Sequence, residues 1–150
     1  MSWLIDTNVL VRLRDADSPH HLLCVQAIQA LRSQREELCV CTQVAIEYYV
    51  VATRPREVNG IGLRTEEALQ DVRDLKALFH WLPEPPDIDR TWQHIVAKYA
   101  ITGKQAHDAR LLALMVSHHV ENLLTLNVPH FRRFEEISVV SPHELGSNAE

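Results

Sequence analysis

Short apolar runs alternate along this chain with longer stretches in which apolar residues recur every three or four positions. The short runs predict buried β-strands, and the three-to-four period predicts amphipathic helices. The predicted strands cover residues 3–5, 38–42, 79–82, 122–126 and 138–140. The predicted helices cover about 18–31, 43–53, 65–79, 88–99 and 105–118.

Strands that alternate with helices need crossover connections, which favour a parallel sheet with helices on both faces. The pattern therefore predicts an α/β fold, a three-layer α/β/α sandwich around a mainly parallel sheet of four or five strands. Ser18-Pro19 and Thr65 are the predicted helix caps. The glycine-containing loop over 55–64 is expected to be the most mobile ordered segment.

Length and composition fit one globular domain. The chain has 150 residues, of which 46% are hydrophobic and 23% charged. We expect a single domain over 1–145 and a frayed tail over 146–150. No apolar run is long enough to span a membrane, and the first residues lack the features of a signal peptide. These features predict a cytoplasmic protein.

The formal net charge of −5 limits the function classes. It excludes a generic basic nucleic-acid binder, but not an acidic enzyme that meets phosphate through bound metal ions. Three cysteines form no disulfide framework, and the C-x-C spacing of Cys39 and Cys41 does not fit a redox or zinc site. We expect the cysteines to be small buried hydrophobes.

The stretch from Trp3 to Leu10 contains the first unusual carboxylate. An apolar strand runs directly into Asp6, which is followed by a polar turn and more apolar residues. Burying an isolated carboxylate is costly, and the carboxyl ends of parallel strands are where ligand sites form. Asp6 is therefore either a site residue or a cap for the following segment. This stretch alone leaves both interpretations open.

Two further acids lie on the apolar faces of predicted helices. Glu47 shares its face with Val44, Val50 and Val51. Asp108 shares its face with Leu111, Leu112 and Met115. The helix dipole explains an acid in a first turn but not its place on a stripe that should be buried.

An ion pair with Arg54, Lys104 or Arg110 is the simple alternative explanation for these two acids. Both helices, however, are predicted to begin at the sheet edge where Asp6 ends its strand. Thr125 and Asn127 add polar side chains at the end of the fourth strand. Clustered carboxylates bind Mg²⁺ or Mn²⁺, and such ions usually act on phosphates.

The chain resembles the PIN-domain family, and most of all the VapC-type toxins of bacterial toxin–antitoxin pairs. The matching segments follow the family's order along nearly the whole chain. They are Ile5-Asp6-Thr7-Asn8-Val9-Leu10, Thr42-Gln43-Val44-Ala45-Ile46-Glu47-Tyr48, His107-Asp108-Ala109-Arg110-Leu111-Leu112-Ala113 and Leu124-Thr125-Leu126-Asn127-Val128-Pro129-His130-Phe131.

The resemblance implies a metal-dependent endoribonuclease that uses Mg²⁺ or Mn²⁺ and has a cognate antitoxin and a homodimeric state. Asp6, Glu47 and Asp108 match the family's three main acidic positions. Asn127 stands where many members carry a fourth acid, so the number of metal ions is left open. The supporting residues would be Asn8, Thr42, Thr125 and Asn127.

Several side chains in or near these segments could have either a structural or a functional role. Arg110, Arg132 and Arg133 are candidate contacts to RNA phosphates, although solvated charge or ion pairing is the default. His107 is a possible acid–base group, but a histidine beside a ligand is more often a hydrogen-bonding neighbour. Trp92 fits the core better than a base-stacking platform.

Other phosphate-handling classes fit poorly. A haloacid-type phosphatase would need a carboxylate where Asn8 stands, and no glycine-rich phosphate loop is present. Two alternatives remain. One is a PIN-like module that only binds a partner, which Asn127 would favour. The other is a DNA-directed nuclease with the same metal site, because contacts to the 2′-hydroxyl cannot be recognised in a sequence.

Overall fold

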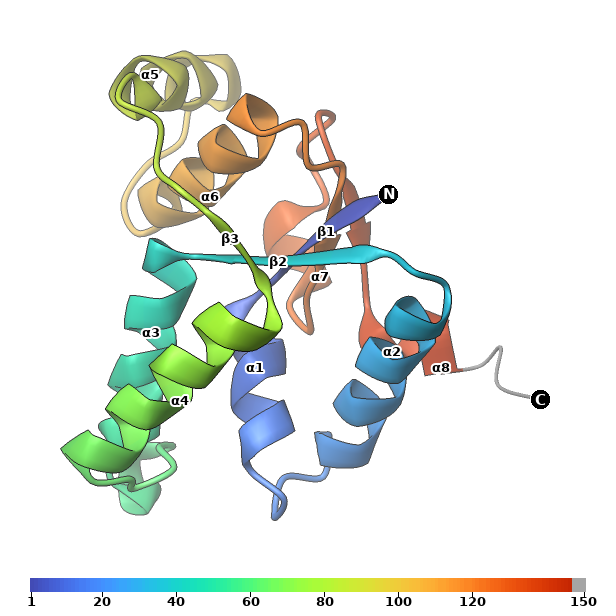
Figure 1. Cartoon of the computed structure of the whole chain (residues 1–150). Helices are drawn as coiled ribbons and strands as arrows, with labels where there is room; N and C mark the ends of the chain where they lie inside the picture. Colours follow the sequence, from blue (N-terminus) through green and yellow to red (C-terminus); the bar gives the residue numbers. More distant parts are fainter. Residues whose placement is uncertain (147–150) are drawn as a thin grey trace.

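Five parallel strands form one sheet in the order β3-β2-β1-β4-β5 (Figure 1). The computed structural model describes residues 1–146. The strands are β1 (Ser2–Ile5), β2 (Glu37–Cys41), β3 (His80–Leu82), β4 (Asn122–Leu124) and β5 (Ser138–Val140). The predicted α/β architecture is confirmed, with five strands rather than four.

Helices cover both faces of this sheet. They are α1 (Thr7–Arg14), α2 (His21–Ser33), α3 (Thr42–Thr53), α4 (Thr65–Leu78), α5 (Ile88–Tyr99), α6 (Gln105–Ser117), α7 (Val128–Phe131) and α8 (Pro142–Gly146), with a short 3₁₀ helix at Arg56–Val58. Figure 1 shows α5 and α6 above the sheet and α1, α2 and α4 below it. No helix in the described part of the chain is long and apolar enough to cross a membrane.

The centre of the sheet explains why the strands lack an alternating pattern. Leu4 and Ile5 of β1 and Leu123 and Leu124 of β4 are all completely buried. A parallel sheet that is covered on both faces buries successive residues of a strand, so its strands are continuously apolar. This is the pattern from which the strands were predicted.

The cysteines are small buried hydrophobes, as predicted. All three are free and buried. Burial raises the pKa of Cys39 to about 12 and the pKa of Cys24 and Cys41 to about 11. Because the thiolate is the reactive form, these thiols are inert near neutral pH.

The prediction missed helix α1 and misplaced the start of α2. The polar turn expected after Asp6 is the first turn of α1, which buries Val9, Leu10 and Val11. An eight-residue helix rich in β-branched residues shows too little periodicity to be recognised. Helix α2 begins at His21, because the Ser18 hydroxyl accepts the His20 N–H in a turn instead of capping the helix.

Other element ends also differ from the sequence-based prediction. Helix α3 begins at Thr42, and strand β4 ends at Leu124 instead of residue 126. Arg64 rather than Thr65 is the N-cap of α4, where Glu67 accepts the Arg64 N–H. The short helices α7 and α8 were not predicted. The domain boundary at 145 stays a prediction. Gly146, the first residue of the predicted tail, is the last residue of α8. The rest of the predicted tail, residues 147–150, lies outside the described residues.

Candidate active site

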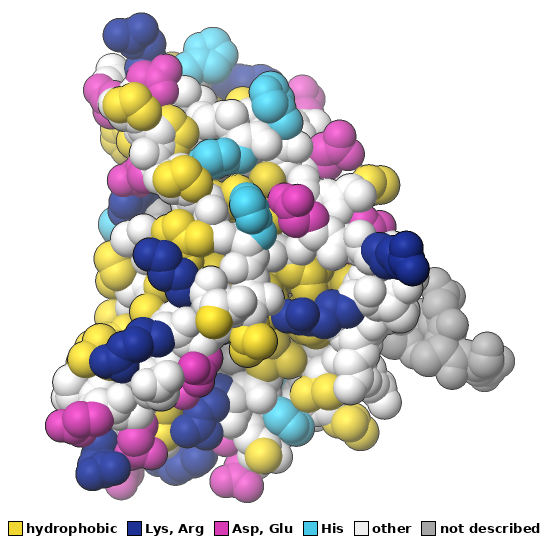
Figure 2. Space-filling view, in the orientation of Figure 1, with side chains coloured by type: hydrophobic (Ala, Val, Ile, Leu, Met, Phe, Trp, Pro, Cys, Tyr) yellow, Lys and Arg dark blue, Asp and Glu magenta, His cyan; other side chains and the backbone are white. Residues whose placement is uncertain are grey.

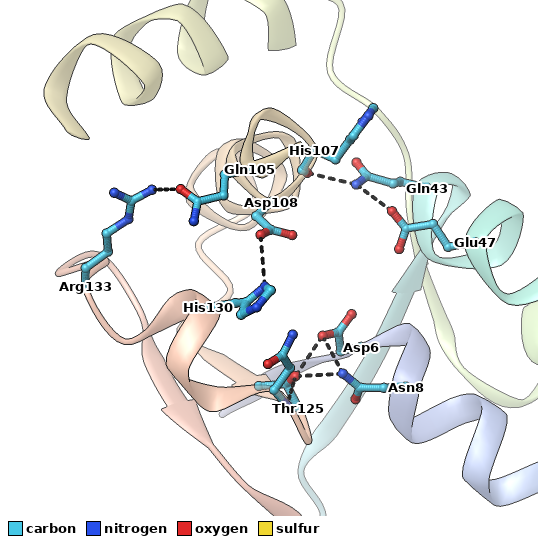
Figure 3. A network of polar contacts seen from close by, with 11 residues as sticks. Asp6, Asn8, Gln43, Glu47, Gln105, His107, Asp108, Thr125, His130 and Arg133 are labelled. Carbon is cyan, nitrogen blue, oxygen red and sulfur yellow. Dashed lines mark hydrogen bonds and ion pairs between the residues drawn. The ribbon is translucent and has the colours of Figure 1, made fainter. Parts of the chain in front are cut away.

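Three carboxylates from separate parts of the chain line one cleft of about 330 Å³. Asp6 follows β1, Glu47 lies in the second turn of α3, and Asp108 lies in the first turn of α6. Figure 3 shows their carboxylates pointing toward a common space. Parallel strands end at one edge of the sheet, so the elements that follow β1 and β2 bring their first residues together there.

Asp6 serves as the N-cap of α1 and also faces the cleft. Its Oδ1 accepts the Thr7 N–H at 2.8 Å, and its Oδ2 accepts the Thr125 hydroxyl at 2.8 Å. Only 6% of the residue is exposed. The pKa of Asp6 is raised to about 6, mainly by burial. The two hydrogen bonds lower it, and the charges of Glu47 and Asp108 add to the rise.

Thr125 connects the end of β4 to the end of β1. This fully buried hydroxyl accepts hydrogen bonds from the Asn8 amide at 3.1 Å and from the Asn127 N–H at 2.9 Å. The Asn8 side-chain oxygen in turn accepts the Leu126 N–H at 3.0 Å. These bonds turn the chain out of the sheet after β4 and place Asn127 on the lining of the cleft.

Both carboxylate oxygens of Glu47 are held by neutral donors. The Thr7 hydroxyl donates to one at 2.9 Å, and the Gln43 amide donates to the other at 3.1 Å. Gln43 also donates to the His107 carbonyl at 2.9 Å, which ties α3 to α6. The Glu47 side chain is therefore fixed in place without a cationic partner among residues 1–146.

Asp108 is more accessible than Asp6, with 24% of its side chain exposed. The His130 ring lies 3.9 Å from its Oδ2 and points toward it (Figure 3). Burial raises the pKa of Asp108, the nearby His130 opposes this, and the charge of Glu47 adds to it. Neighbouring carboxylates thus raise the pKa of both Asp6 and Asp108, and a cation between the acids would relieve this repulsion.

The donor set fits a hard divalent ion. Carboxylate and amide oxygens are the ligands that Mg²⁺ and Mn²⁺ favour. Within residues 1–146, no three His, Cys, Asp or Glu side chains are close enough to hold one ion directly. This spacing suits Mg²⁺, which keeps several waters and binds through one or two carboxylates.

The comparison with known families agrees with this geometry. The profile of the PIN domain matches residues 3–137. The chain belongs to the PIN-domain family. Nucleases of this family generally use divalent metal ions.

One related protein and two solved structures show what this chain is similar to. Ribonuclease VapC24 of Mycobacterium tuberculosis is 27% identical over 132 residues, which cover 87% of this chain and 89% of that protein. Two solved structures share the fold. The sarcin-ricin loop cleaving toxin VapC20 of M. tuberculosis has a TM-score of 0.62 and 13% identity, over 88% of this chain and 95% of that one. A toxin–antitoxin complex from Klebsiella pneumoniae has a TM-score of 0.58 and 24% identity, over 93% and 96%.

The PIN-domain cleft brings together most of the residues predicted to form a site, but not all of them. Asp6, Asn8, Glu47, Asp108 and Asn127 line it, and Thr125 lies directly beneath Asp6. Thr42 does not lie in this cleft. It is exposed at the first residue of α3, and Gln43 one residue later donates a hydrogen bond to Glu47 instead.

Two other predicted positions lie away from the acids. Arg110 forms an ion pair with Glu84 at 2.7 Å, on the side of α6 that faces away from the cleft. His107 is exposed and contributes its backbone carbonyl to the Gln43 contact. Val50, which was expected to share a buried face with Glu47, is 49% exposed.

The arginines after α7 lie nearer to the cleft. Arg133 donates to the Gln105 side chain at 2.6 Å, and its charge partly opposes the rise in the pKa of Asp108 (Figure 3). Arg132 is exposed next to it.

The sequence interpretation did not select several residues that line the PIN-domain cleft or hold its acids. Thr7 and Gln43 hold Glu47, and Arg12 and Arg54 line the cleft beside the acids. The spacing of Gln43 and Glu47 by four positions, which places two side chains together on a helix, could have identified the first contact. The sequence analysis considered Arg54 only as an ion-pair partner for the acids, and Arg12 lies at a helix end, where basic residues are ordinary.

Proposed function

We propose that this protein is a metal-dependent endoribonuclease and the toxin of a type II toxin–antitoxin pair. The observation that carries the proposal is the meeting of Asp6, Glu47 and Asp108 in one cleft of a PIN domain. Its similarity to the protein named ribonuclease VapC24 supports RNA as the substrate. A toxin acting on cellular RNA would work in the cytoplasm.

Asp6 and Asp108 would hold Mg²⁺ or Mn²⁺, and Glu47 would be a further ligand or the base that orients the attacking water. When bound, such an ion offsets charge on the scissile phosphate and lowers the pKa of the attacking water. Thr125 and Asn8 keep the Asp6 carboxylate in one orientation by hydrogen bonding to its Oδ2.

Glu47 is suited to receive a proton because its carboxylate has no cationic partner in the described chain. Thr7 and Gln43 fix its two oxygens by one hydrogen bond each, which leaves lone pairs free to face the cleft. Asn127 also lines the cleft and can orient water through its amide. Because that amide brings no charge, it is a weaker ion ligand than the acid that the family often carries there.

The cleavage test uses purified protein and fluorescent RNA and DNA strands of the same sequence. We expect RNA cleavage with Mg²⁺ or Mn²⁺ and none with EDTA. Asp6→Asn and Asp108→Asn should abolish cleavage while circular dichroism shows a retained fold. Asp89→Asn is the matched control, because it removes an exposed acid from α5.

The other outcomes of this test identify the alternatives. Cleavage of the DNA strand alone would indicate a DNA-directed nuclease. RNA binding without any cleavage would indicate a binding module. Undiminished cleavage by Asp6→Asn and Asp108→Asn would remove the metal site from the mechanism.

We also propose a cognate antitoxin and a homodimer. A structure with the same fold is a toxin–antitoxin complex, which supports the first proposal. Ile46 and Val50 of α3 are 57% and 49% exposed beside the acidic cleft, which supports an apolar contact between two copies. Light scattering should give twice the monomer mass, and Ile46→Glu should reduce it to one copy.

A further inference from the structure

Two arginines line the acidic cleft together with its carboxylates. Arg12 lies in the last turn of α1, and Arg54 is the residue that follows α3. Both are half-buried and line the cleft together with Asp6, Glu47 and Asp108. The cleft therefore contains positive as well as negative side chains.

Neither guanidinium is bound to another side chain. Within residues 1–146, Arg12 and Arg54 form no side-chain hydrogen bond or ion pair. Other arginines of the same region are paired. Arg14 contacts Asp71 at 3.0 Å, and Arg56 contacts Asp15 at 3.4 Å. The two unpaired guanidinium groups are thus the ones that can bind an incoming anion.

The loop after α3 fixes the position of Arg54. Ile61 N–H donates to the Val51 carbonyl at 3.1 Å, and Gly62 N–H donates to the Arg54 carbonyl at 2.9 Å. A Cβ atom on Gly60 would lie 1.8 Å from the Arg54 carbonyl oxygen, so the loop can pack this closely only with glycine there. Asn59 of this loop also lines the cleft.

Helix dipoles give these arginines a simpler explanation. A basic residue at a helix C-terminus contributes about 0.3–1 kcal/mol. That effect needs only a position near the helix end. It does not explain why the two side chains enter the same cleft or why neither pairs with an acid there.

The face of the molecule drawn in Figure 2 shows no continuous basic surface for a polyanion among the described residues. The net charge is −5. On the face drawn in Figure 2, basic and acidic side chains are interspersed and no continuous basic band is visible. Phosphate groups next to the cleaved bond would therefore need cations inside the cleft itself.

We propose that Arg12 and Arg54 bind the RNA phosphates that flank the cleaved bond and position the strand over the three acids. Guanidinium groups suit this role because they can bind phosphate with two parallel hydrogen bonds. The inference rests on the proposed RNA substrate and adds the residues that hold it. The inference assigns substrate binding to these arginines and not to Arg110, because Arg110 forms an ion pair with Glu84.

The test measures RNA affinity without cleavage. Binding of a fluorescent single-stranded RNA is followed by anisotropy in EDTA at several KCl concentrations, for wild type, Arg12→Gln and Arg54→Gln. Each substitution should raise the Kd about tenfold. It should also reduce the slope of log K against log salt by about 0.7, because one phosphate contact is lost. Arg73→Gln removes an exposed charge from α4 and should leave both values unchanged.

A second readout separates substrate binding from a structural role. Removing a positive charge beside the acids should raise the affinity for Mn²⁺, while the affinity for RNA falls. A misfolded variant would lose both. Arg12→Lys and Arg54→Lys should restore part of the RNA affinity, since the charge is retained and only the bidentate geometry is lost.

The outcomes distinguish this inference from the proposed function. If wild-type protein cleaves RNA but the two Gln variants keep its RNA affinity and salt dependence, the inference is overturned and the proposed function stands. If wild-type protein binds RNA through these arginines but does not cleave it with Mg²⁺ or Mn²⁺, the nuclease proposal fails, and Arg12 and Arg54 are RNA-binding residues of a module that does not cleave. Absence of RNA binding by the wild type would overturn the inference.

Discussion

Asp6 combines two functions that looked like alternatives in the sequence. Its Oδ1 caps α1, while its Oδ2 faces Thr125 and the cleft. A carboxylate has enough lone pairs to accept these bonds and still approach a cation. The cost of burying its charge appears in the pKa of Asp6, which is raised to about 6.

This raised pKa predicts how the stability of the metal-free protein depends on pH. The folded-state pKa of about 6 exceeds the ordinary value of 3.8, so the folded protein binds more protons than the unfolded chain between these values. Stability from this group therefore rises as pH falls, by roughly 1–1.5 kcal/mol between pH 7 and pH 5.

Urea unfolding in EDTA at both pH values tests this prediction. Other groups titrate in the same range, so the informative quantity is the difference between wild type and Asp6→Asn. Asp6→Asn should lack this increment, and Asp89→Asn should retain it. Equal pH dependence in wild type and Asp6→Asn would contradict the prediction.

At the scale of elements, a buried polar contact holds the helices beneath the cleft together. The hydroxyl of Tyr48 on α3 donates to Asp71 of α4 at 2.5 Å, and Asp71 also contacts Arg14 of α1. Tyr48 is only 2% exposed, and its burial and the Asp71 carboxylate raise its pKa. Because α1 and α3 carry Thr7 and Glu47, this contact also supports the acidic cleft.

We predict that Tyr48→Phe lowers the free energy of unfolding by about 1.5–3 kcal/mol, the usual range for a hydrogen bond to a charged group. Urea unfolding at neutral pH measures the change. Tyr49→Phe is the matched control on the same helix, since no hydrogen bond of the Tyr49 hydroxyl exists within residues 1–146. A similar effect from both substitutions would argue against the Tyr48 contact.

The elements differ in how well the sequence predicted them. The central strands were predictable because a doubly covered sheet makes each strand continuously apolar. The end of β4 was not, because the Asn8 side chain binds the Leu126 N–H and turns the backbone away. Such a bond between residues 118 positions apart leaves no local pattern.

The same reasoning applies to the candidate site. Asp6 and Asp108 could be predicted because a carboxylate on an apolar strand or stripe conflicts with its surroundings. Glu47 was selected for the same reason, although Val50 beside it is exposed. Gln43 and Thr7 could not be selected, because neutral polar residues near a helix start create no such conflict. Their role depends on the packing of α3 against α1 and α6.

For the whole molecule, the acidic cleft links folding to metal binding. The folded chain brings Asp6, Glu47 and Asp108 into one cleft, where neighbouring carboxylates raise the pKa of Asp6 and Asp108, whereas the unfolded chain does not. An ion that binds only the folded protein stabilises it by about 2.7 kcal/mol when its concentration is 100 times the Kd. For a domain of this size, that corresponds to a rise in Tm of about 5–10 °C.

We therefore predict that Mn²⁺ raises the Tm of the wild-type protein and that EDTA reverses the rise. Asp6→Asn and Asp108→Asn should each lose most of the shift, because each removes charge from the ion's surroundings, while Asp89→Asn should keep it. The shift should also be smaller at pH 5 than at pH 7, since protons then compete with the ion for Asp6. A rise in Tm that survives both cleft substitutions would place the ion elsewhere, and the three carboxylates would then need another explanation for their shared cleft.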